Sequence, residues 1–141
     1  MRSVDFWVEG EPAPQGSKSY VGDGRFIESS KKVAPWRAAV AKAVALLGEV
    51  EQFSGPVVVE VVFYLPRPKS VRRLWPTVPP DTDKLCRSLG DGLSINASLL
   101  SDDSIIVRWE AEKRYADGRP SGAEITIREV DDIPMSFTGE K

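Results

Sequence analysis

Carboxylate side chains gather in the middle of the sequence, in two groups. Asp81 and Asp83 follow a pair of prolines, and Asp102 and Asp103 stand side by side just before a strand-like run. Hard divalent cations such as Mg²⁺ and Mn²⁺ bind several carboxylate oxygens that converge from different elements. The four aspartates are therefore candidate metal ligands, although a helix dipole alone also favours carboxylates at a helix N-terminus.

A helix that begins at the first aspartate group would present its charged residues on one side. The two prolines keep the chain extended up to Asp81, and either Asp81 or Thr82 can cap the helix. Asp83 and Arg87 then share a face, with Asp91 one turn beyond. The other side of the helix is apolar, with a leucine at every fourth position: Leu85, Leu89 and Leu93. We expect the leucines to be buried and the charged groups to be exposed.

The second aspartate group offers one direct ligand rather than two. In an extended chain the side chains of Asp102 and Asp103 point to opposite sides, so the other carboxylate would support the site, cap a turn or face solvent. A cation held by such carboxylates would polarise a phosphodiester and activate water. Arg87 could neutralise the charge that builds on the phosphate oxygens.

The composition excludes several other kinds of catalytic site. The 141 residues include no histidine, which removes Ser-His and Cys-His nucleophiles and histidine-ligated metals. A single cysteine, Cys86, excludes an intrachain disulfide and a cysteine-rich zinc site, and we interpret it as a small buried residue. There is no membrane-spanning apolar run and no secretory signal at residues 1–10, so we expect a cytoplasmic protein without a membrane partner.

Basic residues are gathered locally, although the formal net charge is only −2. Residues 65–80 contain no acidic residue and four basic ones: Arg67, Lys69, Arg72 and Arg73. The stretch 18–37 is also basic on balance, and the C-terminal third is acidic. The distribution of charge bears more on nucleic-acid binding than the sum does, which leaves a local basic surface open.

The hydrophobic pattern predicts one α+β domain over residues 1–130 and a flexible tail at 131–141. Strands are predicted at residues 4–9, 25–28, 57–65, 104–115 and 123–130, and helices at 34–47 and 82–93. The segments 10–24 and 66–80 are predicted to be loops, and the last two strands to form a hairpin through the turn at Asp117 and Gly118. This β-α-β-α-β-β order indicates a mixed sheet with two main helices packed on one face.

Short motifs along most of the chain carry a family resemblance. They are Pro-Ala-Pro-Gln-Gly-Ser-Lys at 12–18, the helix opening at 32–36, Pro-Asp-Thr-Asp-Lys-Leu at 80–85, Gly-Asp-Gly-Leu at 90–93, Leu-Ser-Asp-Asp-Ser-Ile at 100–105, and Lys113. With these motifs the chain resembles the RusA-type Holliday junction resolvases, which are crossover junction endodeoxyribonucleases of bacteria and their phages. The resemblance covers about residues 4–130 and implies a RusA-like fold.

The resemblance implies metal-binding roles for the aspartates and a DNA substrate. Asp81, Asp83 and Asp103 would be the catalytic carboxylates that bind Mg²⁺, or Mn²⁺ as a substitute, with Asp102 and Asp91 as supporting carboxylates. The family works as a homodimer that resolves four-way DNA junctions by paired symmetric nicks in recombination and repair. We expect the DNA contacts to come from basic residues along the chain: Lys18, Lys32, Arg67, Lys69, Arg72, Arg73, Lys84 and Lys113.

The chain departs from the family pattern at two positions beside these aspartates. Lys84 stands where the family usually has asparagine, and Arg87 stands where the family has a lysine that is important for catalysis. Arginine keeps the positive charge but not the compact ammonium group or its ability to lose a proton. Arg87 can therefore replace that lysine as a catalytic cation, but not as a proton donor.

Two alternatives stay open on the sequence alone. The changes at Lys84 and Arg87 could leave a non-catalytic protein that binds branched DNA through a weakened metal site, with binding that depends on salt. A structural protein whose aspartates only cap helices and form turns is the other alternative. It predicts no thermal stabilisation by metal and no DNA binding.

Overall fold

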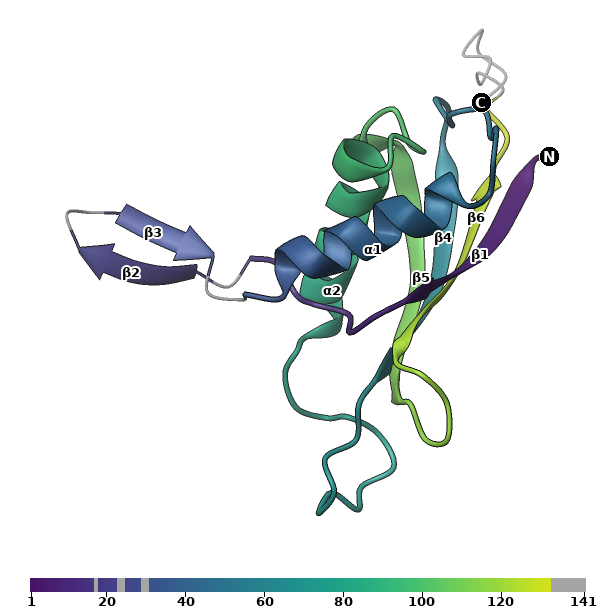
Figure 1. The fold of residues 1–141 in the computed structure, drawn as a ribbon. Coiled ribbons are helices and arrows are strands. Elements are labelled where there is room, and N and C mark those ends of the chain that lie inside the picture. The colour runs from purple at the N-terminus through teal and green to yellow at the C-terminus, as the bar shows by residue number, and fades with distance from the viewer. Residues whose placement is uncertain (17, 23–24, 29–30, 133–141) are drawn as a thin grey trace, which may run out of the picture.

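Four strands form one mixed sheet in the computed structural model, in the order β1-β6-β4-β5 (Figure 1). The structure describes residues 1–16, 18–22, 25–28 and 31–132. The strands of this main sheet are β1 (Ser3–Glu9), β4 (Val57–Leu65), β5 (Ile106–Tyr115) and β6 (Gly122–Glu129). A separate two-stranded sheet consists of β2 (Lys18–Gly22) and β3 (Arg25–Glu28).

Strand β4 lies inside the main sheet because its sequence is almost continuously apolar. Val57, Val59, Val61 and Phe63 are buried, and so is Val58 on the other side of the strand. β4 pairs in parallel with β5 along one edge and antiparallel with β6 along the other. A strand with a near-continuous β-branched run is suited to burial on much of both faces, as the sequence predicts here.

The predicted hairpin between the last two strands is wrong, because β4 lies between β5 and β6. The chain does reverse at Asp117 and Gly118, but the returning strand pairs with β4 and β1 instead. The reason is that the apolar β4 satisfies its backbone and buries its side chains better between two neighbours than at a sheet edge.

The prediction of a loop over residues 10–24 is also partly wrong, since this segment contains β2. β2 pairs antiparallel with β3, the short strand that the sequence did predict at residues 25–28. An isolated strand of four residues leaves its backbone groups unpaired, so β3 needs the preceding segment as a partner.

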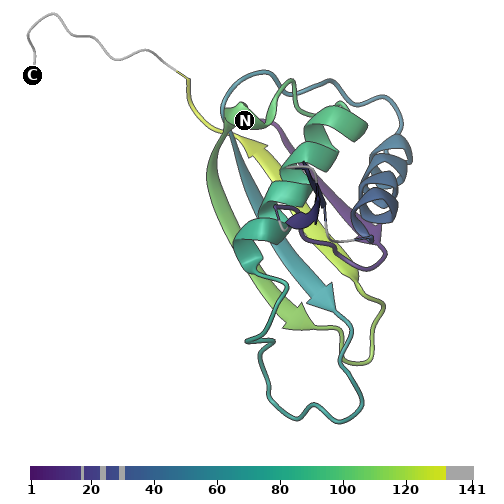
Figure 2. The same cartoon turned by 90° about the vertical axis from the view of Figure 1, so that its left-hand side faces the viewer.

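Two helices, α1 (Val33–Ala45) and α2 (Thr82–Asp91), cover one face of the main sheet (Figure 2). A short π-helical turn, Gly92–Asn96, follows α2. The side chains that these elements bury in the core are Trp36, Val40, Val44, Leu85, Leu89 and Leu93. The predicted mixed sheet with two main helices on one face is therefore confirmed, including the buried leucines of the second helix.

Strand β4, helix α2 and strand β5 form a parallel crossover unit, which fixes where each end of α2 lies. Lys113, late in β5, donates to the carbonyl oxygen of Pro80, just before α2 (2.8 Å). At the other end, Gly90 lies against Asp103 and Ile106 at the start of β5. The two ends of α2 therefore lie beside opposite ends of β5.

Close packing of β1 on β6 requires a glycine at position 122. Gly122 is opposite Glu9 in the antiparallel pair, and a Cβ atom there would lie 2.2 Å from the carbonyl oxygen of Val8 and 2.5 Å from the ring of Trp7. Strand β1 then continues into the segment that carries Gln15.

Some of the predictions fall on residues that the structure does not describe. Residues 133–141, which make up most of the predicted tail, lie outside the described residues, and so does the side chain of Lys18. Within the described residues, no helix has the length and apolar character needed to cross a membrane.

Candidate active site

The start of α2 holds two of the predicted carboxylates in exposed positions. Asp81 directly precedes the helix with extended backbone, and its side chain makes no capping hydrogen bond. Its Oδ2 atom lies 3.9 Å from Nζ of Lys84, and 54% of its side chain is exposed. Asp83, in the first turn, is also exposed. Both carboxylates are therefore accessible to a cation from solvent.

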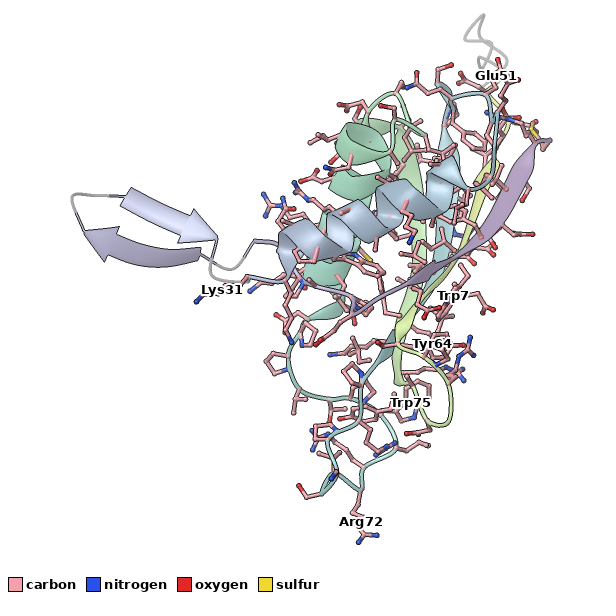
Figure 3. The ribbon with its side chains drawn as sticks, viewed as in Figure 1. Trp7, Lys31, Glu51, Tyr64, Arg72 and Trp75 are labelled. Carbon is pink, nitrogen blue, oxygen red and sulfur yellow. The ribbon has the colours of Figure 1, made fainter. Side chains whose placement is uncertain are left out.

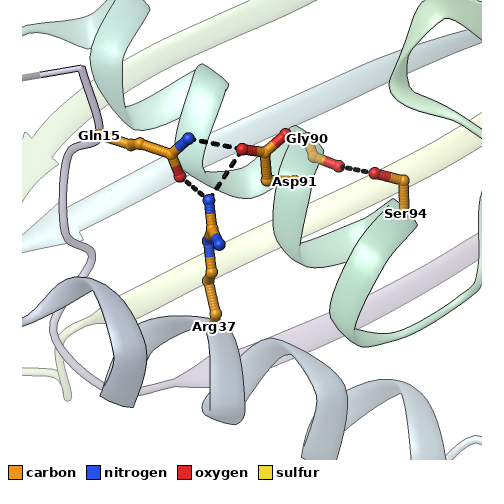
Figure 4. Close-up of polar contacts among 5 residues, drawn as sticks. All are labelled: Gln15, Arg37, Gly90, Asp91 and Ser94. Carbon is orange, nitrogen blue, oxygen red and sulfur yellow. Dashed lines mark hydrogen bonds and ion pairs between the residues drawn. The ribbon is translucent and has the colours of Figure 1, made fainter.

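The last residue of α2, Asp91, is held by two side chains from the N-terminal part of the chain (Figure 4). Arg37 on α1 donates from Nη2 to Oδ2 of Asp91 at 2.8 Å, and Gln15 donates from Nε2 to the same oxygen at 2.5 Å. Arg37 also donates to Oε1 of Gln15, so the three side chains are all hydrogen-bonded to one another. Only 18% of the Asp91 side chain and 22% of the Arg37 side chain are exposed, so this carboxylate is fixed in place.

Asp103 lies next to Asp91, and the charges of two neighbouring carboxylates repel its own. Partial burial raises the pKa of the Asp103 carboxyl, and the negative charges of Asp91 and Asp102 raise it further. The nearby Asp91 carboxylate also favours the protonated form of Asp103, which can donate a hydrogen bond to it, and this contributes to the raised pKa. This end of α2 would therefore gain electrostatic stability from a positive charge placed beside Asp103.

Asp102 caps a short 3-10 turn, Asp103–Ile105, that precedes β5. Its Oδ2 atom accepts a hydrogen bond from the backbone N–H of Ser104 at 2.9 Å. Hydrogen bonds from the side chain and backbone of Ser104 lower the pKa of Asp102. The two neighbouring aspartates thus have different environments, as expected for adjacent residues whose side chains diverge.

The structure brings Asp103 and Asp91 together but leaves the other aspartate group at the far end of the helix. A Cβ atom added to Gly90 would lie 3.6 Å from Cβ of Asp103, which places Asp103 against the last turn of α2. Asp83 precedes Gly90 by seven residues, about 10 Å along a helix axis, and Asp81 lies further still. Among residues 1–16, 18–22, 25–28 and 31–132 there is no group of three His, Cys, Asp or Glu side chains placed to hold a metal ion.

The N-terminal segment packs on the side of α2 that carries Lys84 and Arg87. The backbone N–H of Gln15 donates to the carbonyl oxygen of Lys84 at 3.1 Å. A Cβ atom added to Gly16 would lie only 3.2 Å from a terminal nitrogen of Arg87, and Gly16 has a φ of +107°, which side chains rarely adopt. Glycine at this position lets the motif at 12–18 approach the guanidinium of Arg87.

The predicted DNA-binding residues have three different settings in the described part of the structure. Lys69, Arg72 and Arg73 are exposed on the segment between β4 and α2. Lys113 donates to the carbonyl oxygens of Val78 (2.9 Å) and Pro80, so its ammonium group orders the chain before Asp81.

Two other predicted DNA-binding residues pair with acidic residues of this chain. Lys32 forms an ion pair with Glu11 at 2.8 Å. Arg67 donates from Nε and Nη2 to the carboxylate of Asp117, at 2.7 and 3.0 Å.

Sequence reasoning did not single out Arg37 or Gln15 as functional residues. Their sequence signals are weak: Gln15 lies inside the motif at 12–18, and Arg37 reads as one more cation near a helix start. Cys86, in contrast, is buried as predicted, and burial raises the pKa of its thiol to about 11, with the charge of Asp83 adding to the effect. The thiol is therefore not a nucleophile at neutral pH.

Comparison with known proteins settles the family. Residues 9–128 match the family model for endodeoxyribonuclease RusA, a stretch that runs from the end of β1 into β6. The chain belongs to the RusA endodeoxyribonuclease family. RusA family proteins are nucleases that bind branched DNA, and they generally depend on a divalent metal.

A bacterial protein of similar length also matches this chain. It is the "Uncharacterized protein YqaN" of Bacillus subtilis (strain 168), which is 29% identical over 144 residues. The match covers 92% of this chain and 99% of that protein. The similarity therefore extends over most of this chain and nearly all of that protein.

Proposed function

We propose that the protein is a Mg²⁺-dependent endonuclease that resolves four-way DNA junctions by paired symmetric nicks and acts as a homodimer. The observation that supports this most is the family match over residues 9–128, which includes both aspartate groups. A two-fold dimer would supply two copies of the site, one for each nick. In this proposal residues 1–130 form the single catalytic domain.

Carboxylates have the chemistry that a hard cation prefers. We propose that Asp81, Asp83 and Asp103 hold Mg²⁺ and that Asp102 supports them. Because Asp81 and Asp83 lie at the opposite end of α2 from Asp103 in one protomer, sharing one ion requires the homodimer to place Asp81 and Asp83 of one protomer beside Asp103 of its partner. Asp103 is the primary position, because partial burial and then the charges of Asp91 and Asp102 raise its pKa, and a cation would relieve the repulsion among these carboxylates. When bound, the metal supplies Lewis-acid polarisation of the phosphodiester and a more acidic water molecule.

The chain's own residues orient the site and balance its charge. Arg37 and Gln15 hold Asp91, and the Asp91 carboxylate lies beside Asp103. In this proposal Asp91 orients the Asp103 carboxyl. Arg87, on the exposed side of α2, supplies a fixed positive charge for the phosphate oxygens. Arginine stays protonated throughout the reaction, so in this proposal Arg87 acts through its charge and moves no proton.

The proposed DNA surface combines the exposed cations of the segment 66–80 with basic residues near α2. Lys69, Arg72 and Arg73 are exposed and suited to phosphate contacts that release counterions. The remaining members of the proposed surface are Lys18, Lys32, Arg67, Lys84 and Lys113. Binding is therefore expected to weaken steeply as the salt concentration rises.

One observation favours the alternative of a non-catalytic protein that binds branched DNA. The ammonium group of Lys84, which replaces the usual asparagine, lies 3.9 Å from Asp81 and competes with a metal for that carboxylate. This alternative predicts junction binding that depends on salt but no turnover that metal stimulates.

A cleavage assay decides between the two functions. A synthetic four-way junction labelled on each strand is incubated with the protein and Mg²⁺, and paired nicks at symmetric positions are expected. Asp83→Asn should abolish the nicks, and Asp5→Asn, which changes an exposed aspartate on β1, should not. Junction binding without any nicking by the unmodified protein would establish the alternative, and nicking that survives Asp83→Asn would refute the proposed site.

A further inference from the structure

The segment between β4 and α2 exposes large apolar side chains beside basic ones. Leu74 is 73% exposed, Trp75 is 47% exposed and Val78 is 40% exposed. Exposed apolar groups rimmed by charge commonly mark a binding surface. In Figure 3, Arg72 lies at the end of this segment farthest from the sheet and points away from the sheet, and Trp75 lies between Arg72 and the sheet.

Arg67 holds this segment in a fixed shape. Its Nη1 atom donates to the carbonyl oxygens of Val71 (3.2 Å) and Arg73 (2.6 Å), and its other nitrogens pair with Asp117. Its guanidinium also lies over the ring of Tyr115, 4.2 Å from the centroid. The exposed Leu74 and Trp75 therefore sit on a preorganised loop, and Asp117 already has a positive partner.

A small hollow lies beside the ring of Trp75. It has a volume of about 200 Å³ and is lined by Leu74, Trp75, Arg114, Tyr115 and Asp117. The guanidinium of Arg114 stands over the Trp75 ring, 5.3 Å from its centroid. A flat apolar wall next to an arginine suits a planar ring that can stack, and the exposed cations nearby suit an anion attached to it.

We propose that the Leu74–Trp75 tip binds an unstacked nucleobase at the branch point of its DNA substrate, while Lys69, Arg72 and Arg73 contact the flanking phosphates. This inference rests on the proposed function, since it needs branched DNA as the substrate. Bases inside a continuous duplex are stacked on both faces, and a branch point leaves base faces that the tip can reach. The surrounding charges are mainly positive, which favours nucleic acid over a basic protein partner.

The tip is linked to the start of α2 through the backbone. Lys113 donates to the carbonyl oxygens of Val78 and Pro80, so the chain between Trp75 and Asp81 is tied to β5. A base seated on Trp75 would therefore also set the position of the DNA relative to Asp81 and Asp83. The tip would select branched over linear DNA and place the backbone to be cut.

The test measures the affinity for a four-way junction and for a linear duplex of the same sequence, with EDTA present so that no strand is cut. Trp75→Ala should weaken junction binding about tenfold or more, as expected for the loss of one stacked base, and leave duplex binding nearly unchanged. Trp75→Phe, which keeps a stacking ring, should restore most of the affinity. Leu46→Ala is the matched control, because Leu46 is 78% exposed at the end of α1.

A fluorescent base analogue, 2-aminopurine, placed at the branch point provides a second measurement. Its emission should change when the wild-type protein or Trp75→Phe binds, and should not change with Trp75→Ala at a saturating concentration. Thermal unfolding confirms that each variant is folded.

The outcomes separate this inference from the function on which it rests. Equal losses for junction and duplex, full junction affinity in Trp75→Ala, or no rescue by Trp75→Phe would each overturn the stacking inference alone. A wild-type protein that binds the junction no better than the duplex would overturn the proposed function and this inference with it.

Discussion

The two ends of helix α2 carry the same chemical groups in different settings. At the start, Asp81 and Asp83 are exposed, and Asp81 makes a long ion pair with Lys84 at 3.9 Å. At the end, Asp91 is held by Arg37 and Gln15 and lies against Asp103. The C-terminal end is thus preorganised before any ligand arrives, whereas the N-terminal end is accessible but loosely held. Their separation of about 10 Å, seven helical residues, makes the comparison testable one end at a time.

The largest expected effect is on DNA cleavage, when the C-terminal end of α2 loses the negative charge of Asp103. Asp103→Asn should lower the single-turnover rate of junction cleavage by about a thousandfold or more, because a metal ligand contributes several kcal/mol in the transition state. Junction affinity without metal should not fall, since a negative charge has been removed. A variant that keeps more than a tenth of the wild-type rate would contradict the central role given to this end.

A smaller effect is expected when the support of Asp91 is removed. Arg37→Ala should lower the cleavage rate about 10- to 100-fold, as for groups that hold a metal ligand in place, and Arg37→Lys should recover part of the loss. The apparent affinity for Mn²⁺, measured by titration calorimetry, should weaken in parallel. Lys84→Ala, at the N-terminal end of α2, should leave the cleavage rate within a few-fold of wild type. Equal losses of rate in Arg37→Ala and Lys84→Ala would show that the two ends of α2 do not differ in preorganisation.

Metal binding should also stabilise the fold. A divalent ion at one hundred times its dissociation constant adds about 2.7 kcal/mol to the free energy of unfolding, which corresponds to a rise of several degrees in Tm. We expect Mg²⁺ to raise the Tm of the wild-type protein, and of Asp81→Asn to a lesser extent. Asp103→Asn should show no rise, and differential scanning fluorimetry with and without EDTA provides the measurement.

The smallest effect concerns pH in the absence of metal. The pKa of Asp103 is raised above its ordinary 3.8 in the folded protein. The free energy of unfolding therefore falls as the pH rises from 3.8 through the raised pKa of the folded state, because ionisation is less favourable there than in the unfolded chain. Asp103→Asn should therefore gain a few tenths of a kcal/mol in unfolding free energy near pH 7, a small value because the group is exposed. The gain should shrink as the pH falls through the ordinary value of 3.8 and vanish well below it, where Asp103 is protonated in both the folded and the unfolded state. Urea unfolding at the two pH values measures it, and a gain that grows on acidification would contradict the assigned sign.

The sequence predicts the parts of this molecule that depend on local pattern. The leucines of α2, the buried β4 and the layer arrangement follow from the spacing of apolar residues. The aspartates stand out because they gather in two short stretches. The prediction of a hairpin between β5 and β6 was wrong because strand pairing depends on how much apolar surface each pair of neighbours buries. The order of strands along the sequence does not determine this buried surface.

The support of Asp91 could not be predicted for a related reason. Gln15 and Arg37 are separated from Asp91 by 76 and 54 residues, and nothing local distinguishes them from other polar side chains. The same holds for Arg67, which the sequence presents as one more cation of a basic loop. Its bonds to Asp117 become visible only when the ends of β4 and β5 are placed side by side.

The glycine at position 122 makes the site sensitive to a methyl group on a distant strand. An alanine there would force apart the first and last strands of the sheet, because the added carbon meets the Val8 carbonyl group. The first strand leads directly to Gln15, so the displacement would pass along the chain to the amide that steadies Asp91. A substitution that touches no charged residue would thus act on the reaction mechanically, through the backbone.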